Sequence, residues 1–115
     1  MQHLVFVYGT LRKGEANHHY LAQSQCLGSC QSGLDYKLYD LGEYPAVIDG
    51  NTAISGEVYL IDEHTLQALD KLEDVPVEYR RETIETPFGT AWIYLYQDSS
   101  KLVNEIASGD WCQRV

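Results

Sequence analysis

A short loop after an apolar strand is the first place in this sequence where residue types and spacing could bind a ligand. The run Leu4–Val7 holds four apolar residues, two of them β-branched, which predicts a fully buried strand. It leads directly into the loop Tyr8–Gly14. Gly9 allows a sharp bend and a close approach to the main chain, and unpaired N–H groups at a strand end can bind a carboxylate or a phosphate. An ordinary exit from a strand would carry the same residues, so both interpretations stay open.

Glu73 is the second candidate, because its position on an expected helix gives a carboxylate unusual surroundings. The pattern Glu63–Glu73 predicts a helix, and at about 100° per residue Glu73 falls between Leu66 and Leu69 on the apolar side. Glu73 also lies at the C-terminal end, where the helix dipole disfavours a negative charge. Both effects predict a raised pKa for Glu73, suited to general acid–base catalysis near neutral pH. The alternative is that the helix frays at Asp74 and that Glu73 turns into solvent.

These two candidates must be positioned by a chain with more strand patterns than helix patterns. Asp62 is a suitable N-cap for the helix, and Val75-Pro76 ends it. The last strand alternates apolar and aromatic residues on both faces, which is typical of a central strand or a barrel wall. The expected strands are Leu4–Val7, Cys26–Ser29, Leu34–Tyr39, Ile54–Ile61, Tyr79–Thr86 and Thr90–Gln97, and the expected helical segments are Asn17–Gln23, Glu63–Glu73 and Leu102–Ile106. We therefore predict a mostly antiparallel α+β domain, and a closed barrel is one form that its sheet could take.

Length and charge limit the classes of function. The 115 residues, 44% of them hydrophobic, predict a single domain over residues 1–115 with a packed core. The net charge of −9 argues against binding to nucleic acid or to an anionic membrane surface, although local backbone donors can still bind a small anion. No apolar run reaches the roughly 20 residues of a membrane span, and the first apolar stretch is too short for a signal peptide. We therefore expect a soluble, cytoplasmic protein.

Cysteine and histidine spacing indicates neither a metal site nor a disulfide framework. Cys26, Cys30 and Cys112 form an odd set without zinc-ligand spacing, and we predict free, buried thiols. The adjacent His18 and His19 would diverge by about 100° on a helix, and the other two histidines have no partner at ligand spacing. We expect no metal and no cofactor.

Short motifs along the whole chain together resemble the gamma-glutamylcyclotransferase-like family, in its small single-domain bacterial form. In order, the motifs are Tyr8-Gly9-Thr10-Leu11, Tyr44-Pro45-Ala46, Gly56-Glu57-Val58-Tyr59, Leu69-Asp70 with Glu73 and Tyr79, and Ser108-Gly109-Asp110-Trp111. The resemblance implies a mixed α/β fold around a small β-barrel, with the active site at its mouth. It also implies the release of 5-oxoproline from γ-glutamyl amines or peptides.

The same resemblance implies roles for individual residues. Glu73 matches the family's catalytic acid/base, and the γ-glutamyl part would be bound through the backbone of Tyr8, Gly9, Thr10 and Leu11. The substrate's own α-amine would attack its γ-carbonyl and close a five-membered ring, so no nucleophile from the enzyme is needed. Tyr79 could point its hydroxyl into the site or form an aromatic wall.

Further residues are candidates with two interpretations each. Arg12 could pair with a substrate carboxylate or lie in a surface loop. Glu78, as a strand neighbour of Tyr79, should face the other way. Three other tyrosines could line the pocket or pack in the core: Tyr44, Tyr94 and Tyr96.

Three functions remain open at this point. The favoured one is a cofactor-independent gamma-glutamylcyclotransferase acting on a small γ-glutamyl amine or dipeptide. The second is a non-catalytic module that uses the same pocket to bind a small carboxylate. The third is an interaction protein that dimerises through the aromatic face with Trp92 and Tyr94. No oligomeric state follows from the sequence.

Overall fold

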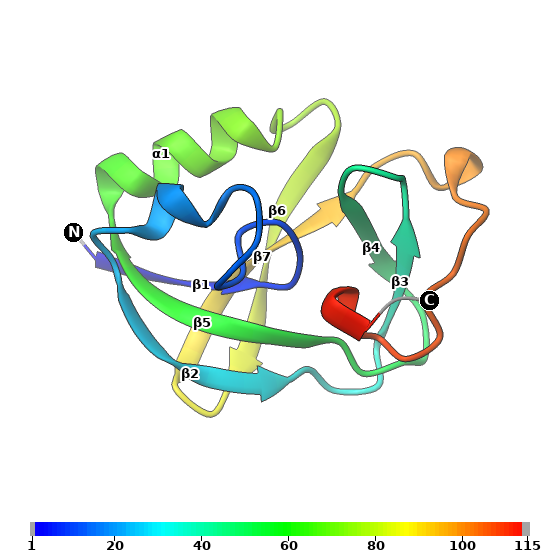
Figure 1. The fold of residues 1–115 in the computed structure, drawn as a ribbon, viewed down its shortest axis with the longest axis horizontal. Helices are drawn as coiled ribbons and strands as arrows, with labels where there is room; N and C mark the ends of the chain where they lie inside the picture. Colours follow the sequence, from blue (N-terminus) through cyan, green and yellow to red (C-terminus); the bar gives the residue numbers. More distant parts are fainter. Residues whose placement is uncertain (1, 114–115) are drawn as a thin grey trace.

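The computed structural model describes residues 2–113 and contains a five-stranded sheet, a two-stranded sheet and the helix α1 (Glu63–Leu72). The larger sheet has the strand order β2-β5-β1-β7-β6 (Figure 1). Its strands are β1 (Gln2–Val7), β2 (Gln25–Gln31), β5 (Ser55–Asp62), β6 (Tyr79–Thr86) and β7 (Gly89–Tyr96). The smaller sheet pairs β3 (Tyr36–Asp40) with β4 (Pro45–Asp49), and three short 3-10 helices are η1 (His18–Leu21), η2 (Ser99–Lys101) and η3 (Trp111–Gln113). No helix in the described range is long and apolar enough to cross a membrane.

β1 lies at the centre of the larger sheet, as its fully apolar sequence predicts. It pairs antiparallel with β5 over its whole length and parallel with β7, where Val5 lies opposite Trp92. Val5 and Phe6 are fully buried on opposite faces of the strand. Because β1 is the middle strand, the loop that follows it leaves the sheet between β5 and β7.

The larger sheet is open and mixed, so the expectation of a closed β-barrel is wrong. β2 and β6 are its two edges and do not pair with each other. One face of the sheet packs against α1, and the other packs against β3, β4 and Trp111 (Figure 1). An open sheet covered on both faces gives β7 the same two apolar faces as a barrel wall. The α+β class is confirmed.

Two expected elements differ in the structure, and one strand was not expected. The unexpected strand is β4, which begins at Pro45, a position where proline is tolerated but which reads as a turn in the sequence. The segment 102–106 is not helical: Glu105 forms an isolated bridge with Tyr39, and the helical turn precedes it as η2. The segment 17–23 forms only the four-residue η1.

The cysteines are free, but the prediction that they are buried is wrong. Cys26 and Cys112 are exposed and Cys30 is half-buried. Cys26 and Cys30 lie on β2, which is an edge of the sheet, and an edge strand leaves side chains near solvent.

Candidate active site

The C-terminal end of α1 fixes the position of Glu73. The residue caps the helix, and the next two residues close a Schellman motif. In this motif the N–H of Asp74 donates to the Lys71 carbonyl at 3.2 Å, and the N–H of Val75 donates to the Asp70 carbonyl at 3.0 Å. Asp74 adopts a left-handed conformation with φ 51°. The helix therefore ends in a defined turn rather than fraying, and the fraying alternative for Glu73 does not apply.

The surroundings of Glu73 disfavour its ionised form. Burial raises the pKa of its carboxyl to about 7, and the negative charge of Glu78 adds to the effect. The side chain is half-buried, and no residue in the range 2–113 donates a hydrogen bond to it. A carboxyl group with a pKa near 7 can both accept and deliver a proton at neutral pH.

The loop after β1 is held through its carbonyl groups. The carbonyl oxygens of Gly9, Thr10 and Leu11 accept hydrogen bonds, in that order, from the Arg12 N–H at 3.0 Å, the Asn17 N–H at 2.8 Å and the His18 Nδ1–H at 3.0 Å. Among residues 2–113, no oxygen accepts from the N–H groups of Gly9–Leu11. Three successive backbone donors thus have no acceptor in this part of the chain, and backbone donors of this kind bind an anion where they face a cavity.

Gly9 is required by its packing rather than by its conformation. A Cβ atom at this position would overlap the ring of Pro45, the first residue of β4. The Pro45 carbonyl in turn accepts a hydrogen bond from the Tyr79 hydroxyl at 2.6 Å. The absence of a side chain at Gly9 thus lets the loop, β4 and β6 meet closely.

All six residues selected from the sequence line one narrow cavity of about 30 Å³. These residues are Tyr8, Gly9, Thr10, Leu11, Glu73 and Tyr79. A wider cavity of about 160 Å³ adjoins it, and Thr10, Tyr44, Glu73 and Tyr79 line both. Glu73 is therefore one of the residues that border both cavities.

The tyrosines of the narrow cavity serve mainly as walls, because their hydroxyl groups already have protein partners. Tyr8 donates to the Tyr94 carbonyl at 2.6 Å, and Tyr94 donates to Asp70 at 2.8 Å. The Tyr79 hydroxyl binds Pro45 rather than the cavity, so its aromatic-wall interpretation fits. Tyr96 packs against Tyr79 with 5.2 Å between ring centroids and does not line the narrow cavity.

Sequence reasoning missed the part that Glu78 plays in this region. Glu78 precedes β6 and lies in the turn after α1, so strand alternation does not apply to it. It lines the wider cavity with Asn17 and Glu73, and it accepts a hydrogen bond from the Tyr44 hydroxyl at 2.6 Å. This hydrogen bond raises the pKa of Tyr44 to about 12. Nearness to Glu73 in sequence was the signal that could have identified Glu78.

Residues 5–113 match the family model described as "Gamma-glutamyl cyclotransferase, AIG2-like". A Vibrio cholerae protein named "Putative gamma-glutamylcyclotransferase" is 67% identical, with all of both chains covered. The solution structure of YtfP from Escherichia coli is 44% identical, with a TM-score of 0.79 and 96% and 97% of the two chains covered. An uncharacterized protein of Pyrococcus horikoshii is 32% identical, with a TM-score of 0.84 and coverage of 95% and 89%.

Proposed function

We propose that this chain, which belongs to the gamma-glutamyl cyclotransferase, AIG2-like family, releases 5-oxoproline from a small γ-glutamyl amine or peptide. The observation that most supports this proposal is that Glu73 and Gly9–Leu11 line a common cavity, and that no oxygen among residues 2–113 accepts from the N–H groups of Gly9–Leu11. An acid/base and an oxyanion or carboxylate site are the two elements that this cyclisation needs.

The reaction forms one bond and breaks one bond. The α-ammonium group of the substrate gives a proton to the Glu73 carboxylate, and the resulting amine attacks the γ-carbonyl carbon. The new C–N bond closes the five-membered lactam, and the C–N bond to the leaving amine breaks. The protonated Glu73 delivers its proton to the leaving nitrogen and then takes the second proton from the new ring nitrogen, so that the lactam keeps one N–H. This second proton passes to the released amine, which departs as an ammonium ion, and Glu73 returns to the carboxylate. A pKa of about 7 gives Glu73 access to both forms during this cycle.

The two adjoining cavities suit the two halves of such a substrate. The narrow cavity has room for only about two water molecules, which is too little for a whole γ-glutamyl group. The group would therefore extend past Glu73 into the wider cavity. The backbone donors of Gly9–Leu11 then bind the α-carboxylate or the developing oxyanion. The leaving amine occupies the wider cavity beside Asn17 and Glu78. Holding the substrate folded back on itself converts an entropic cost into binding.

The test is turnover by the purified protein with a panel of γ-glutamyl amines and γ-glutamyl dipeptides, with 5-oxoproline measured by mass spectrometry. We expect release from at least one substrate and a loss of roughly 100- to 10,000-fold in kcat for Glu73→Gln. Glu105→Gln is the matched control, because Glu105 is exposed and lies outside both cavities.

Two outcomes would contradict the proposal. Unchanged turnover in Glu73→Gln would remove this residue from the mechanism. Stabilisation of the protein by glutamate or 5-oxoproline without turnover of any substrate would indicate instead a non-catalytic module that binds a small carboxylate.

A further inference from the structure

Arg12 directly follows Gly9–Leu11 in the loop after β1 and links this loop to two distant parts of the chain. Its Nε donates to Glu57 of β5 at 3.3 Å, and its Nη1 donates to Asp110 at 2.7 Å. Only 13% of the Arg12 side chain is exposed. The guanidinium is therefore committed to the protein, and neither sequence-based interpretation of Arg12, as a substrate ligand or as a surface residue, describes it.

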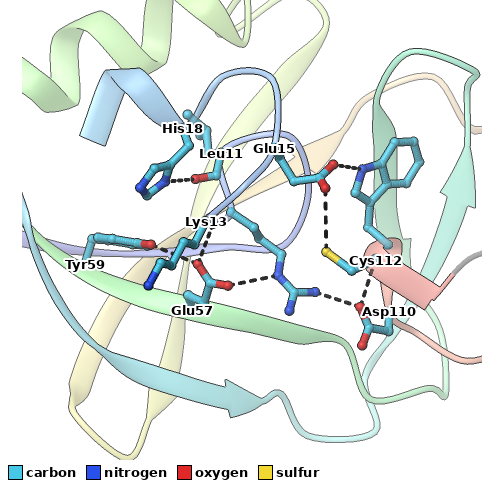
Figure 2. A network of polar contacts seen from close by, with 10 residues as sticks. Leu11, Lys13, Glu15, His18, Glu57, Tyr59, Asp110 and Cys112 are labelled. Atoms are coloured by element: carbon cyan, nitrogen blue, oxygen red, sulfur yellow. Dashed lines mark hydrogen bonds and ion pairs between the residues drawn. The ribbon is translucent and has the colours of Figure 1, made fainter. Parts of the chain in front are cut away.

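Other hydrogen bonds hold the neighbouring residues of the loop to the same two parts of the chain, β5 and the segment 110–112. Glu57 also accepts from the Lys13 N–H at 3.0 Å and from the Tyr59 hydroxyl at 2.9 Å (Figure 2). Glu15 accepts from Trp111 Nε1 at 3.0 Å and approaches the Cys112 sulfur at 3.9 Å. Residues 12–15 are thus fixed between β5 and the segment 110–112.

The hydrogen bonds of Arg12 also fix the position of the residues that line the cavity. The Arg12 N–H is the donor that engages the Gly9 carbonyl, at 3.0 Å. A shift of the Arg12 main chain would therefore break the first of the three hydrogen bonds that hold the Gly9–Leu11 backbone. Only a planar guanidinium can donate to Glu57 and Asp110 from two nitrogens at once; the single ammonium of a lysine cannot reproduce this geometry.

We propose that Arg12 is a positioning residue, which holds the backbone donors of Gly9–Leu11 toward the cavity by joining Glu57 to Asp110. The segment 110–112 then supports the binding site indirectly, by holding Arg12, and does not contact the substrate. The consequence for turnover rests on the proposed function, whereas the order of the loop can be measured without any substrate.

The test compares Arg12→Gln and Arg12→Lys with the native chain by ¹⁵N relaxation and by kinetics. Arg80→Gln is the control, because Arg80 also pairs with a carboxylate, Glu82, but on the outer strand β6. We expect the amide order parameters of Gly9–Leu11 to fall from about 0.85 to below about 0.6 in both Arg12 variants, while those of β6 and β7 stay unchanged. Arg80→Gln should leave the loop unchanged.

The kinetic readout separates positioning from a general loss of structure. For an active γ-glutamyl substrate, we expect kcat/KM to fall by roughly 10- to 100-fold in Arg12→Gln, mainly through KM. The acidic limb of the pH profile should stay in place, because Glu73 is untouched. If no substrate turns over, the proposed function fails, and the order parameters still decide the role of Arg12.

Order parameters of Gly9–Leu11 equal to those of the native chain would overturn the proposal, and so would an equal fall across the whole sheet. Should Arg12→Gln fail to fold, Asp110→Asn replaces it. That variant removes one of the two ion pairs and keeps Arg12 beside Glu57. A loop as ordered as in the native chain would then also count against the proposal.

Discussion

Glu73 and Glu78 lie on either side of the turn between α1 and β6, and both line the wider cavity. The two carboxylates have different surroundings. Glu78 accepts a hydrogen bond from the Tyr44 hydroxyl, whereas Glu73 receives none from the residues 2–113. Carboxyl groups in such different surroundings differ in pKa, and the pKa of Glu73 is the one raised to about 7.

The first prediction concerns the pH dependence of turnover. The proposed reaction needs the Glu73 carboxylate, so kcat/KM should fall as the pH drops through about 7. Glu78→Gln removes a negative charge that raises the pKa of Glu73, so its acidic limb should move to lower pH. Tyr44→Phe keeps that charge and is the control. A pH–rate profile of Glu78→Gln that coincides with the native profile would exclude this coupling.

The second prediction is that Glu73 costs stability at high pH. Its pKa is about 7 in the folded protein against 4.5 for the free side chain, so folding takes up a proton between these values. The resulting loss in unfolding free energy is absent well below pH 4.5 and is complete well above pH 7. Glu73→Gln should therefore be more stable than the native chain at pH 9, by up to roughly 3 kcal/mol, and much less so at pH 5.

Urea unfolding at pH 5 and pH 9 measures this difference, and Glu105→Gln is the control with an exposed carboxylate. A stability difference between Glu73→Gln and the native chain that is the same at both pH values would contradict the prediction.

The third prediction concerns the contact between Gly9 and Pro45. Gly9→Ala places a methyl group on the Pro45 ring, so we expect a loss of about 1–3 kcal/mol in unfolding free energy and a lower kcat/KM. Pro45→Ala makes room for that methyl group. In a double-mutant cycle measured by thermal or urea unfolding, Gly9→Ala should cost less in the Pro45→Ala background. Strict additivity would show that the two residues do not compete for space.

The fourth prediction tests the turn that ends α1. Asp74 has φ 51°, a conformation that glycine adopts freely and a β-branched residue resists. Asp74→Val should lower the unfolding free energy by about 1–2 kcal/mol and displace Glu73, whereas Asp74→Gly should not destabilise the protein. Thermal unfolding compares the two variants. Equal melting temperatures for Asp74→Val and Asp74→Gly would mean that the turn is not strained.

Local patterns in the sequence were enough to predict the parts of the site that depend on nearby residues. Asp62 caps α1 as expected, with its carboxylate accepting from the Thr65 N–H at 2.7 Å. The helical periodicity that placed Glu73 beside Leu66 and Leu69 also predicted its raised pKa. The contact of the cap lies within one turn of helix, whereas the burial of Glu73 also involves the loop after β1 and β6, and the added charge comes from Glu78.

Features that depend on distant residues could not be predicted. The partners of Arg12 are 45 and 98 positions away, and nothing in its local spacing distinguishes an internal ion pair from a ligand. The reason for Gly9 is Pro45, which belongs to a strand that the sequence pattern obscured. Closure of the sheet depends on whether β2 meets β6, and alternation within a single strand carries no information on that pairing.

The central place of β1 has a consequence for how the molecule assembles. β1 is early in the chain, but its two neighbours are β5 and β7, and Val5 lies beside Trp92. Pairings over such separations fold slowly, because a long loop must close before any contact rewards it. During synthesis on a ribosome, this apolar strand would therefore stay unpaired until β5 and β7 have emerged.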